Sequence, residues 1–299
     1  MAEYKTDGEL PIVYEVDGPQ DGPAILMLNG LGMQLTQWPQ DFIDAFHKAG
    51  FRTVRVDNRD VGKSGKVTGG KAPNPYLQLV LGLFGLSAGA PYSLAEMADD
   101  AASVIDHMGL DKAHVLGLSM GGIISQMLAA RHPERVEKLA LFMTTTGNRS
   151  LPLPSGQARK ILMSRDPAPA SRDEAIQQMV DKWSFFVTQD GGMSEDELRS
   201  FHGAAVDRGM DRAGWHRQMA AILETGDLRR HTRTISAHTL VVHGTEDRLV
   251  PPASGMDVHK NIKGSRLEMI EGMGHDLPSI HVERLTGLVV SHFGDTSVT

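Results

Sequence analysis

Short apolar runs recur along the chain, separated by segments in which apolar residues return every three or four positions. Several runs are apolar at nearly every position, as in residues 24–28 (AILML) and 239–242 (TLVV). Strands of this kind are typical of a parallel sheet that helices cover on both faces. The pattern predicts strands at residues 10–16, 24–28, 53–56, 113–116, 138–142, 239–243 and 266–270.

A helix is predicted from residue 94 to residue 108, where the apolar residues keep to one face. Ser93 and Glu96 have the spacing of a capping box at its start. Strands that alternate with helices in this way predict an α/β fold, with a mostly parallel central sheet flanked by helices.

The alternation stops between residues 147 and 234. Two proline-rich stretches are followed there by helical patterns. Ser171 with Glu174, and Ser194 with Glu197, each have the spacing of a capping box. We therefore expect a helical insertion at residues 147–234, between core segments at residues 1–146 and 235–299.

The composition of the chain excludes several kinds of site and partner. The chain has 299 residues, no cysteine and a net charge of -7. The lack of cysteine excludes disulfides, thiolate metal sites and a cysteine nucleophile, and no metal-binding spacing of histidines appears. The acidic balance argues against a nucleic-acid partner. We expect neither a metal nor a cofactor.

No targeting or membrane segment is visible in the sequence. The N-terminal residues are acidic and polar, unlike a signal peptide. The longest apolar stretch, residues 76–90, is shorter than the ~20 residues that a spanning helix needs. We expect a cytoplasmic protein without stable membrane insertion. Residues 76–90 are interpreted as a lid over the substrate, a core helix or an interface.

The strongest chemical signal is the sequence Gly117-Leu118-Ser119-Met120-Gly121. It follows a predicted strand and precedes a helical pattern, so Ser119 is expected on a sharp turn above the sheet. The flanking glycines leave room where a Cβ atom would clash. Ser119 is therefore the candidate nucleophile, and it needs a base oriented by a third group.

Two candidate partners follow later strands of the predicted sheet. Asp247 comes just after the strand at 239–243, and His275 comes just after the strand at 266–270. The order Ser, Asp, His along the chain is that of hydrolases with a serine on a strand-to-helix turn. Glu246 is a weaker candidate for the acid, and Asp276 is interpreted as shaping the loop of His275.

An acyl-transfer site also needs two backbone N–H donors for the oxyanion. One is expected from Met120, directly after the candidate nucleophile. The other is expected from the glycine-rich loop after the strand at 24–28, with the N–H of Leu31 preferred and that of Gly32 as the alternative. Gly30, Gly32, Trp183 and Phe186 are expected to line the substrate pocket.

These motifs together resemble the α/β-hydrolase superfamily along nearly the whole chain. The resemblance rests on NGLG (29–32), DNRDVGKSG (57–65), GLSMGG (117–122), GTEDRLVP (244–251) and GMGHDLP (272–278). A looser similarity is to serine carboxylesterases that include aclacinomycin methylesterase-like enzymes. The resemblance implies a triad of Ser119, Asp247 and His275, and a helical cap after the sixth core strand. Asn29 departs from the family, where many members have histidine.

Three other signals carry less weight. Gly62-Lys63-Ser64 resembles the end of a P-loop, but Asp57 stands where the earlier glycine is required, so no nucleotide site is expected. Asp57 also ends a strand near the site, where some relatives place a functional acid. His243 is interpreted as a packed residue at a strand end.

The favoured function is therefore a serine hydrolase that cleaves carboxylic esters through an acyl-enzyme intermediate. Its substrate is expected to be a small-molecule ester with an apolar group. A carbon–carbon bond hydrolase or a cofactor-free perhydrolase of the same fold would use the same three groups, so both stay open. A non-catalytic ligand-binding protein of this fold is the least favoured alternative.

Overall fold

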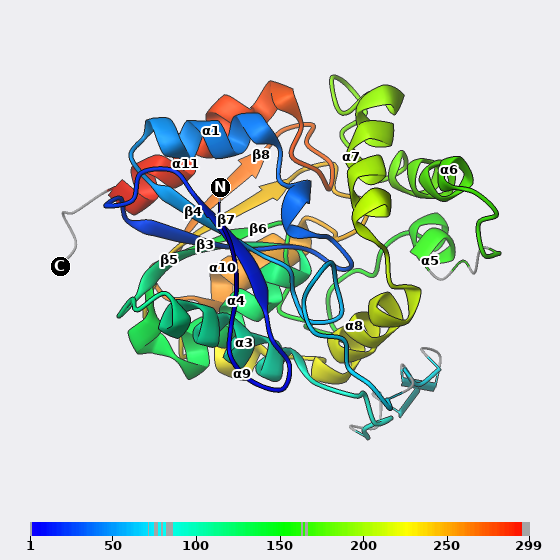
Figure 1. The fold of residues 1–299 in the computed structure, drawn as a ribbon, viewed down its shortest axis with the longest axis horizontal. Helices are drawn as coiled ribbons and strands as arrows, with labels where there is room; N and C mark the ends of the chain where they lie inside the picture. The colour runs from blue at the N-terminus through cyan, green and yellow to red at the C-terminus, as the bar shows by residue number, and fades with distance from the viewer. Residues whose placement is uncertain are drawn as a thin grey trace.

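The computed structural model describes residues 2–70, 72–74, 77–78, 80–81, 86–162, 164 and 167–294. Within these residues, eight strands form one sheet in the order β1-β2-β4-β3-β5-β6-β7-β8 (Figure 1). The pairs of β1 with β2 and of β2 with β4 are antiparallel, and the other pairs are parallel. The predicted α/β fold with a mostly parallel sheet is confirmed. The strands are β1 (Ala2–Lys5), β2 (Val13–Asp17), β3 (Ala24–Leu28), β4 (Arg52–Val56), β5 (Ala113–Leu118), β6 (Val136–Phe142), β7 (His238–Gly244) and β8 (Arg266–Ile270).

The seven predicted strands are all present, with shifts of a few residues at their ends. The first of them begins at Val13 rather than residue 10, and β5 continues to Leu118. Strand β1 was not predicted. All four of its residues are exposed, so it lacks an apolar pattern, and backbone pairing with β2 holds it at the sheet edge.

Helices cover both faces of the sheet, as a parallel sheet requires (Figure 1). Helices α1 and α11 pack apolar side chains such as Phe42, Phe46 and Leu285 against one face. Helices α3, α4 and α10 pack residues such as Val104, Leu128 and Val258 against the other. The helices are α1 (Gln40–Lys48), α3 (Leu94–His107), α4 (Met120–Arg131), α5 (Gly156–Leu162), α6 (Arg172–Trp183), α7 (Glu195–Arg208), α8 (Arg212–Thr225), α9 (Arg229–Thr232), α10 (Ala253–Asn261) and α11 (Ser279–Gly294).

Local signals place the starts of several helices. Helix α3 begins after Ser93, whose hydroxyl accepts a hydrogen bond from the N–H of Glu96, while the Glu96 side chain binds back to Ser93. The same capping box of Ser194 and Glu197 starts α7. These two predicted capping boxes are confirmed, whereas at the start of α6 the Ser171 hydroxyl accepts the Glu174 N–H but the Glu174 side chain accepts the Ala170 N–H instead of completing the box. Each satisfies N–H groups that the first helical turn leaves without a partner.

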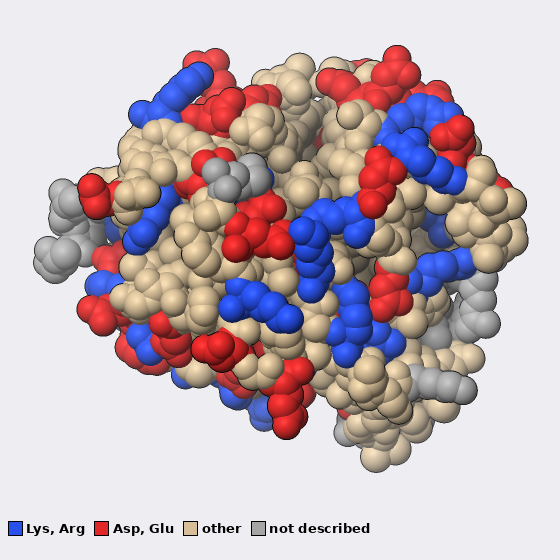
Figure 2. Space-filling model, viewed as in Figure 1, with Lys and Arg blue, Asp and Glu red and all other residues tan. Residues whose placement is uncertain are grey.

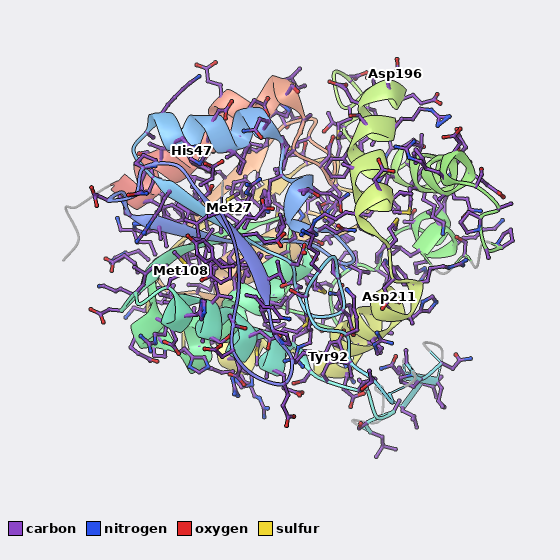
Figure 3. All side chains as sticks on the ribbon, in the orientation of Figure 1. Met27, His47, Tyr92, Met108, Asp196 and Asp211 are labelled. Carbon is purple, nitrogen blue, oxygen red and sulfur yellow. The ribbon has the colours of Figure 1, made fainter. Side chains whose placement is uncertain are left out.

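Helices α5 to α8 follow β6 and lie together beside one end of the sheet (Figure 1). We call residues 156–225 the α5–α8 segment. It has a small apolar cluster of its own around Ile176, Val180 and Leu198. Figure 3 labels Asp196, at the start of α7, and Asp211, directly before α8. Helix α7 therefore runs from the outer end of the segment toward the start of α8. In Figure 2, acidic and basic side chains are interspersed over the face in view.

The apolar stretch at 76–90 lies partly outside the described residues. Of those described, Leu77, Val80 and Leu86 are exposed, whereas Gln78 is buried. The Gln78 side-chain amide donates a 3.0 Å hydrogen bond to the Ala220 carbonyl of α8. Gln78 is thus attached to α8. No helix in the described part of the chain is long and apolar enough to cross a membrane.

Candidate active site

Ser119 occupies a strained turn between β5 and α4. Its backbone has φ 55° and ψ −117°, a conformation that L-residues rarely adopt. The Ser119 N–H donates to the Phe142 carbonyl at 2.8 Å, and the Thr144 hydroxyl donates to the Ser119 carbonyl at 2.8 Å. The turn is therefore held on both sides. The side chain is partly exposed, and its hydroxyl makes no hydrogen bond with any described residue.

The glycines on either side of Ser119 allow a close approach of α4 to the sheet. A Cβ atom at Gly121 would overlap the carbonyl oxygen of Leu28 at the end of β3. A Cβ atom at Gly117 would overlap the hydroxyl of Ser125 and the carbonyl of Gly121. The N-terminus of α4 can therefore lie against the loop that follows β3.

Asp247 and His275 are in direct contact at the same edge of the sheet. They follow β7 and β8, as Ser119 follows β5, and parallel strands end at a common edge. The His275 Nδ1 atom lies 2.7 Å from the Asp247 Oδ2 atom, and both residues are buried. The other carboxylate oxygen, Oδ1, accepts the backbone N–H groups of Leu249 and Val250, at 2.9 and 2.7 Å.

The surroundings of Asp247 keep it ionised. Burial raises the pKa of this carboxyl group, but the electrostatic interaction with His275 and the hydrogen bonds with His243 and His275 outweigh burial and lower the pKa to about 2. His243 is fully buried, and its Nε2 atom donates to the Val250 carbonyl at 2.9 Å and lies 3.3 Å from Asp247 Oδ2. His243 is packed at the end of β7, as expected, and it also contacts the acid.

The loop of His275 is attached to the chain that follows α6. The His275 N–H donates to the Phe186 carbonyl at 2.7 Å, and the Gly274 N–H donates to the Thr188 hydroxyl at 2.9 Å. Asp276 accepts both the N–H and the hydroxyl of Thr188, at 2.9 and 2.7 Å. Burial raises the pKa of Asp276. These bonds support the interpretation that Asp276 shapes this loop.

The two backbone donors expected from the sequence belong to the start of α4 and to the loop after β3. Met120 is the first residue of α4, so its N–H has no partner within the helix. Gly30 packs against Ser119, since a Cβ atom there would lie 3.4 Å from the Ser119 Cβ. The Gly32 N–H is already engaged with the Gln218 side-chain oxygen at 2.9 Å. Asn29 donates its amide to the Gln34 carbonyl at 2.8 Å and so braces the same loop.

A cavity of about 380 Å³ lies between the α5–α8 segment and the loops of the sheet. Its volume is within the range of small-molecule sites. Gly32, Trp183 and Phe186 line it, whereas Gly30 lies against Ser119 instead. The further lining residues are mainly apolar and include Val61, Leu162, Met179, Val206, Met210 and Trp215.

The cavity adjoins the loop after β3 through Gly32 and the loop of His275 through Phe186, while Ser119, Asp247 and His275 themselves are not among the residues that line it. A Cβ atom at Gly32 would approach Trp215 Cδ1 to 2.6 Å, so the Trp215 ring packs directly on the loop after β3. Phe186 lines the cavity, while its carbonyl holds the N–H of His275. Within the described residues, no cluster of three or more His, Asp or Glu side chains is placed to hold a metal ion.

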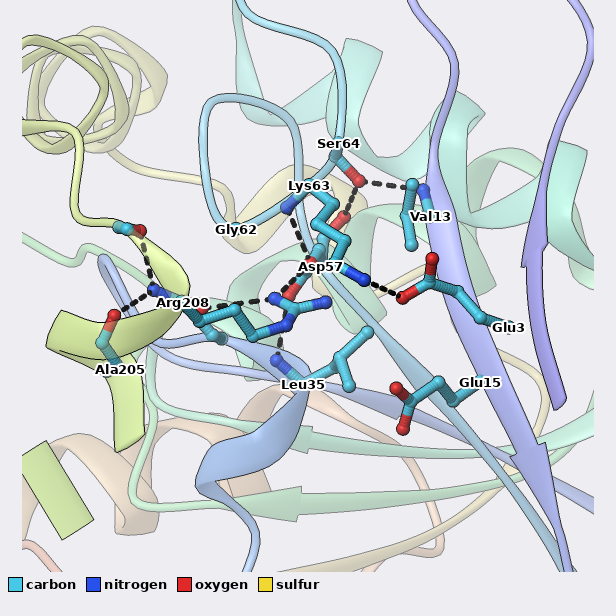
Figure 4. A network of polar contacts seen from close by, with 12 residues as sticks. Glu3, Val13, Glu15, Leu35, Asp57, Gly62, Lys63, Ser64, Ala205 and Arg208 are labelled. Atoms are coloured by element: carbon cyan, nitrogen blue, oxygen red, sulfur yellow. Dashed lines mark hydrogen bonds and ion pairs between the residues drawn. The ribbon is translucent and has the colours of Figure 1, made fainter. Parts of the chain in front are cut away.

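A buried ion pair joins the α5–α8 segment to the loop after β4 (Figure 4). Asp57 Oδ2 accepts Arg208 Nη1 at 2.6 Å and the Lys63 N–H at 2.9 Å. Asp57 Oδ1 accepts the Leu35 N–H at 2.8 Å. Arg208 Nη1 also donates to the Gln34 side-chain oxygen at 3.0 Å. Both oxygens of Asp57 are occupied and its side chain is fully buried, so its role in this structure is to hold loops together.

Replacing Arg208 with leucine is expected to lower the free energy of unfolding by about 3–5 kcal/mol, because Asp57 would be left as an unpaired buried charge. Urea unfolding monitored by circular dichroism measures this loss. The matched control is Arg172→Leu, which breaks the exposed Arg172–Asp207 pair and should lower the free energy of unfolding far less, because water screens an exposed pair. Adding Asp57→Asn to Arg208→Leu should restore part of the stability. Equal losses in the two single variants would contradict the assignment.

The segment that resembles a P-loop is bound to the sheet instead. The Ser64 hydroxyl donates to the Asp57 carbonyl at 2.6 Å and accepts the Val13 N–H at 2.8 Å. Lys63 forms an exposed 2.6 Å ion pair with Glu3 of β1. These contacts tie the loop after β4 to β1 and β2.

Residues 23–281 match the family model described as the alpha/beta hydrolase fold. The chain therefore belongs to this family, as the sequence motifs indicated.

Among curated proteins, the chain is 26% identical to the rhodomycin D methylesterase of a Streptomyces species, with 93% of this chain and 92% of that protein covered. It is also 26% identical to a 2-hydroxy-6-oxononadienedioate/2-hydroxy-6-oxononatrienedioate hydrolase of Burkholderia vietnamiensis, with 95% and 91% covered. Among solved structures, the enol-lactonase of Burkholderia xenovorans has a TM-score of 0.73 at 23% identity, with 98% of this chain and 100% of that chain covered. The methylesterase relatives support ester hydrolysis, and hydrolases of other kinds are related as well.

Proposed function

We propose that this protein hydrolyses carboxylic esters with Ser119 as nucleophile, His275 as base and Asp247 as the residue that orients His275. The observation that carries the proposal is the 2.7 Å contact of His275 Nδ1 with a buried, ionised Asp247, at the sheet edge where Ser119 stands on its turn. A carboxylate at Nδ1 holds the proton on that nitrogen and leaves Nε2 free to accept one from a hydroxyl.

The reaction proceeds in two halves. Ser119 Oγ attacks the ester carbonyl while His275 takes its proton, and the tetrahedral intermediate collapses as His275 protonates the departing alcohol. Water, activated by His275, then releases the acid from the acyl-enzyme. The N–H groups of Met120 and Leu31 bind the oxyanion. Leu31 is preferred to Gly32 because the Gly32 N–H is already bound to Gln218.

Residues 147–234 act in this proposal as a cap that encloses the substrate. The cavity beneath the α5–α8 segment is mainly apolar and includes two tryptophans, Trp183 and Trp215. It suits a small-molecule ester with a bulky apolar group. The methylesterase relatives favour a small alcohol as the leaving group, so we assign the bulky group to the acyl side.

Carbon–carbon bond hydrolysis is the second candidate function. The specific observation that favours it is the 26–27% identity to hydrolases of 2-hydroxy-6-oxononadienedioate over about nine-tenths of the chain. Carbon–carbon bond hydrolysis cleaves the bond between a ketone carbonyl and the neighbouring carbon. The same serine-histidine pair could serve this reaction and ester hydrolysis.

The test is a series of methyl esters whose acyl group grows from acetyl to a multi-ring aromatic acid, assayed beside a 2-hydroxy-6-oxodienoate. Ser119→Ala serves as the blank in each reaction. Ester turnover that depends on Ser119 and rises with acyl size supports the proposal. Turnover of the dienoate without ester turnover would assign the second function. Turnover of neither substrate by a folded protein would contradict both.

A further inference from the structure

Gln218 of α8 joins the cap to two loops of the sheet. It is fully buried. Its side-chain oxygen accepts the Gly32 N–H at 2.9 Å, and its side-chain nitrogen donates to the Arg59 carbonyl at 2.8 Å. A carboxamide has one acceptor and one donor end, and here the two ends bind different loops. Leucine or methionine could make neither bond.

The loop that Gln218 holds is the one that carries the proposed oxyanion donor Leu31. Gly32 has φ +70°, and the Trp215 ring packs on it from the same helix, one turn before Gln218. At the other side of Leu31, Gly30 lies against Ser119. The peptide groups on both sides of Leu31 are therefore positioned, one by the turn of Ser119 and one by α8.

The second attachment of Gln218 is to a fixed point. Arg59 forms two hydrogen bonds with Asp100, at 2.6 and 2.8 Å, and its guanidinium lies 5.0 Å from the centre of the Tyr92 ring. Its carbonyl is consequently held by the body of the protein. Because the Arg59 carbonyl holds the Gln218 nitrogen in place, the bond from the Gln218 oxygen to the Gly32 N–H limits the movement of the loop after β3.

We propose that Gln218 is a positioning residue that sets the oxyanion hole from the cap. The inference rests on the proposed function. It goes further in stating that the cap contributes to the rate of the chemical step as well as to the choice of substrate. Binding the Gly32 N–H keeps that donor from the substrate and orders the chain next to Leu31. Oxyanion donors act because they are fixed in place before the charge develops, so a looser loop should slow the reaction.

The experiment compares Gln218→Leu with Asn261→Leu. The control removes another buried amide with two bonds, in which the Asn261 oxygen accepts Arg233 Nε and the nitrogen donates to the Asp257 carbonyl, both at 2.8 Å, away from the oxyanion loop. We expect kcat of Gln218→Leu to fall about 10- to 100-fold, less than the loss of a whole oxyanion donor, while KM stays within about threefold. The affinity for a trifluoromethyl ketone, which forms a tetrahedral adduct, should fall in parallel. Asn261→Leu should match wild type in kcat.

A second measurement separates this inference from the proposed function. The rate at which a fluorophosphonate modifies Ser119 also depends on the oxyanion hole, whatever the natural substrate is. Slower labelling of Gln218→Leu than of Asn261→Leu, at equal melting temperatures, supports the inference even if no ester is turned over. Equal rates in the two variants would overturn it, while leaving ester hydrolysis intact. Absence of labelling in wild type would overturn it as well.

Discussion

Replacing Ser119 with alanine is expected to lower kcat for ester hydrolysis by about 10⁵- to 10⁶-fold, because no acyl-enzyme can form without the hydroxyl. The residual rate would come from the oxyanion donors acting on water. The melting temperature should change by about 1 °C or less, since the Ser119 hydroxyl makes no hydrogen bond with any described residue and alanine keeps the same backbone restrictions. Steady-state kinetics and differential scanning calorimetry measure the two effects.

Ser119→Gly is the informative companion of this variant. Glycine adopts φ 55° without the backbone strain that serine has there. Removing this strain stabilises the fold by roughly 1–3 kcal/mol, and the entropy lost on ordering a glycine offsets part of that gain. We expect Ser119→Gly to be inactive and to melt above Ser119→Ala. An Ala variant that kept more than about a hundredth of the activity would remove Ser119 from the mechanism.

Asp247→Asn is expected to lower kcat by about 10⁴-fold with little change in fold. The carboxylate accepts the proton on His275 Nδ1, whereas an amide can place its own NH₂ group there and favour the wrong tautomer. Glu246→Gln is the matched control. Glu246 is exposed, so its variant should stay within about twofold of wild type. A larger loss in Glu246→Gln than in Asp247→Asn would transfer the acid role to Glu246.

The same variant has a distinct pH signature in stability. Because the pKa of folded Asp247, about 2, lies below its usual value of 3.8, the ionised carboxylate stabilises the fold above the unfolded pKa. That contribution, about 2 kcal/mol, is lost as the pH falls through the folded pKa. Urea unfolding between pH 6 and pH 3 should therefore show wild type losing stability toward acid faster than Asp247→Asn. Parallel curves would mean that Asp247 is not ionised as described.

Residues that follow strand ends could be placed from the sequence because a parallel sheet brings those ends to one edge. Ser119, Asp247 and His275 were predicted at one edge in this way, although they are far apart along the chain, and Asp247 and His275 are in contact there. Gln218 and Arg208 could not be found, because their partners, Gly32 and Asp57, lie in other segments and no local pattern records such pairs. Strand β1 was missed for the related reason that its residues are all exposed.

The sequence also did not predict that β4 lies between β2 and β3 in the sheet, out of chain order. An apolar run identifies a buried strand without naming its neighbour, and the right-handed connections of parallel strands still leave several orders open. The same holds for the cavity. Trp183 and Phe186 were expected to line the substrate pocket, and both line the cavity. The contact of Trp215 with the Gly32 loop was not predicted, because it exists only where α8 packs against that loop.

The lack of a Cβ atom at Gly121 has a consequence for redesigning this protein. The contact between the start of α4 and the end of β3 affects how far apart the proposed Met120 and Leu31 donors stand, and one added methyl group would push these elements apart. On α8, Trp215 and Gln218 contact the loop after β3 and would also be kept, whereas the other cavity-lining residues of α6 and α8 are available for substitution. A library that diversifies the cavity wall while leaving residues 117 and 121 as glycine would therefore explore new substrates on an unchanged reaction centre.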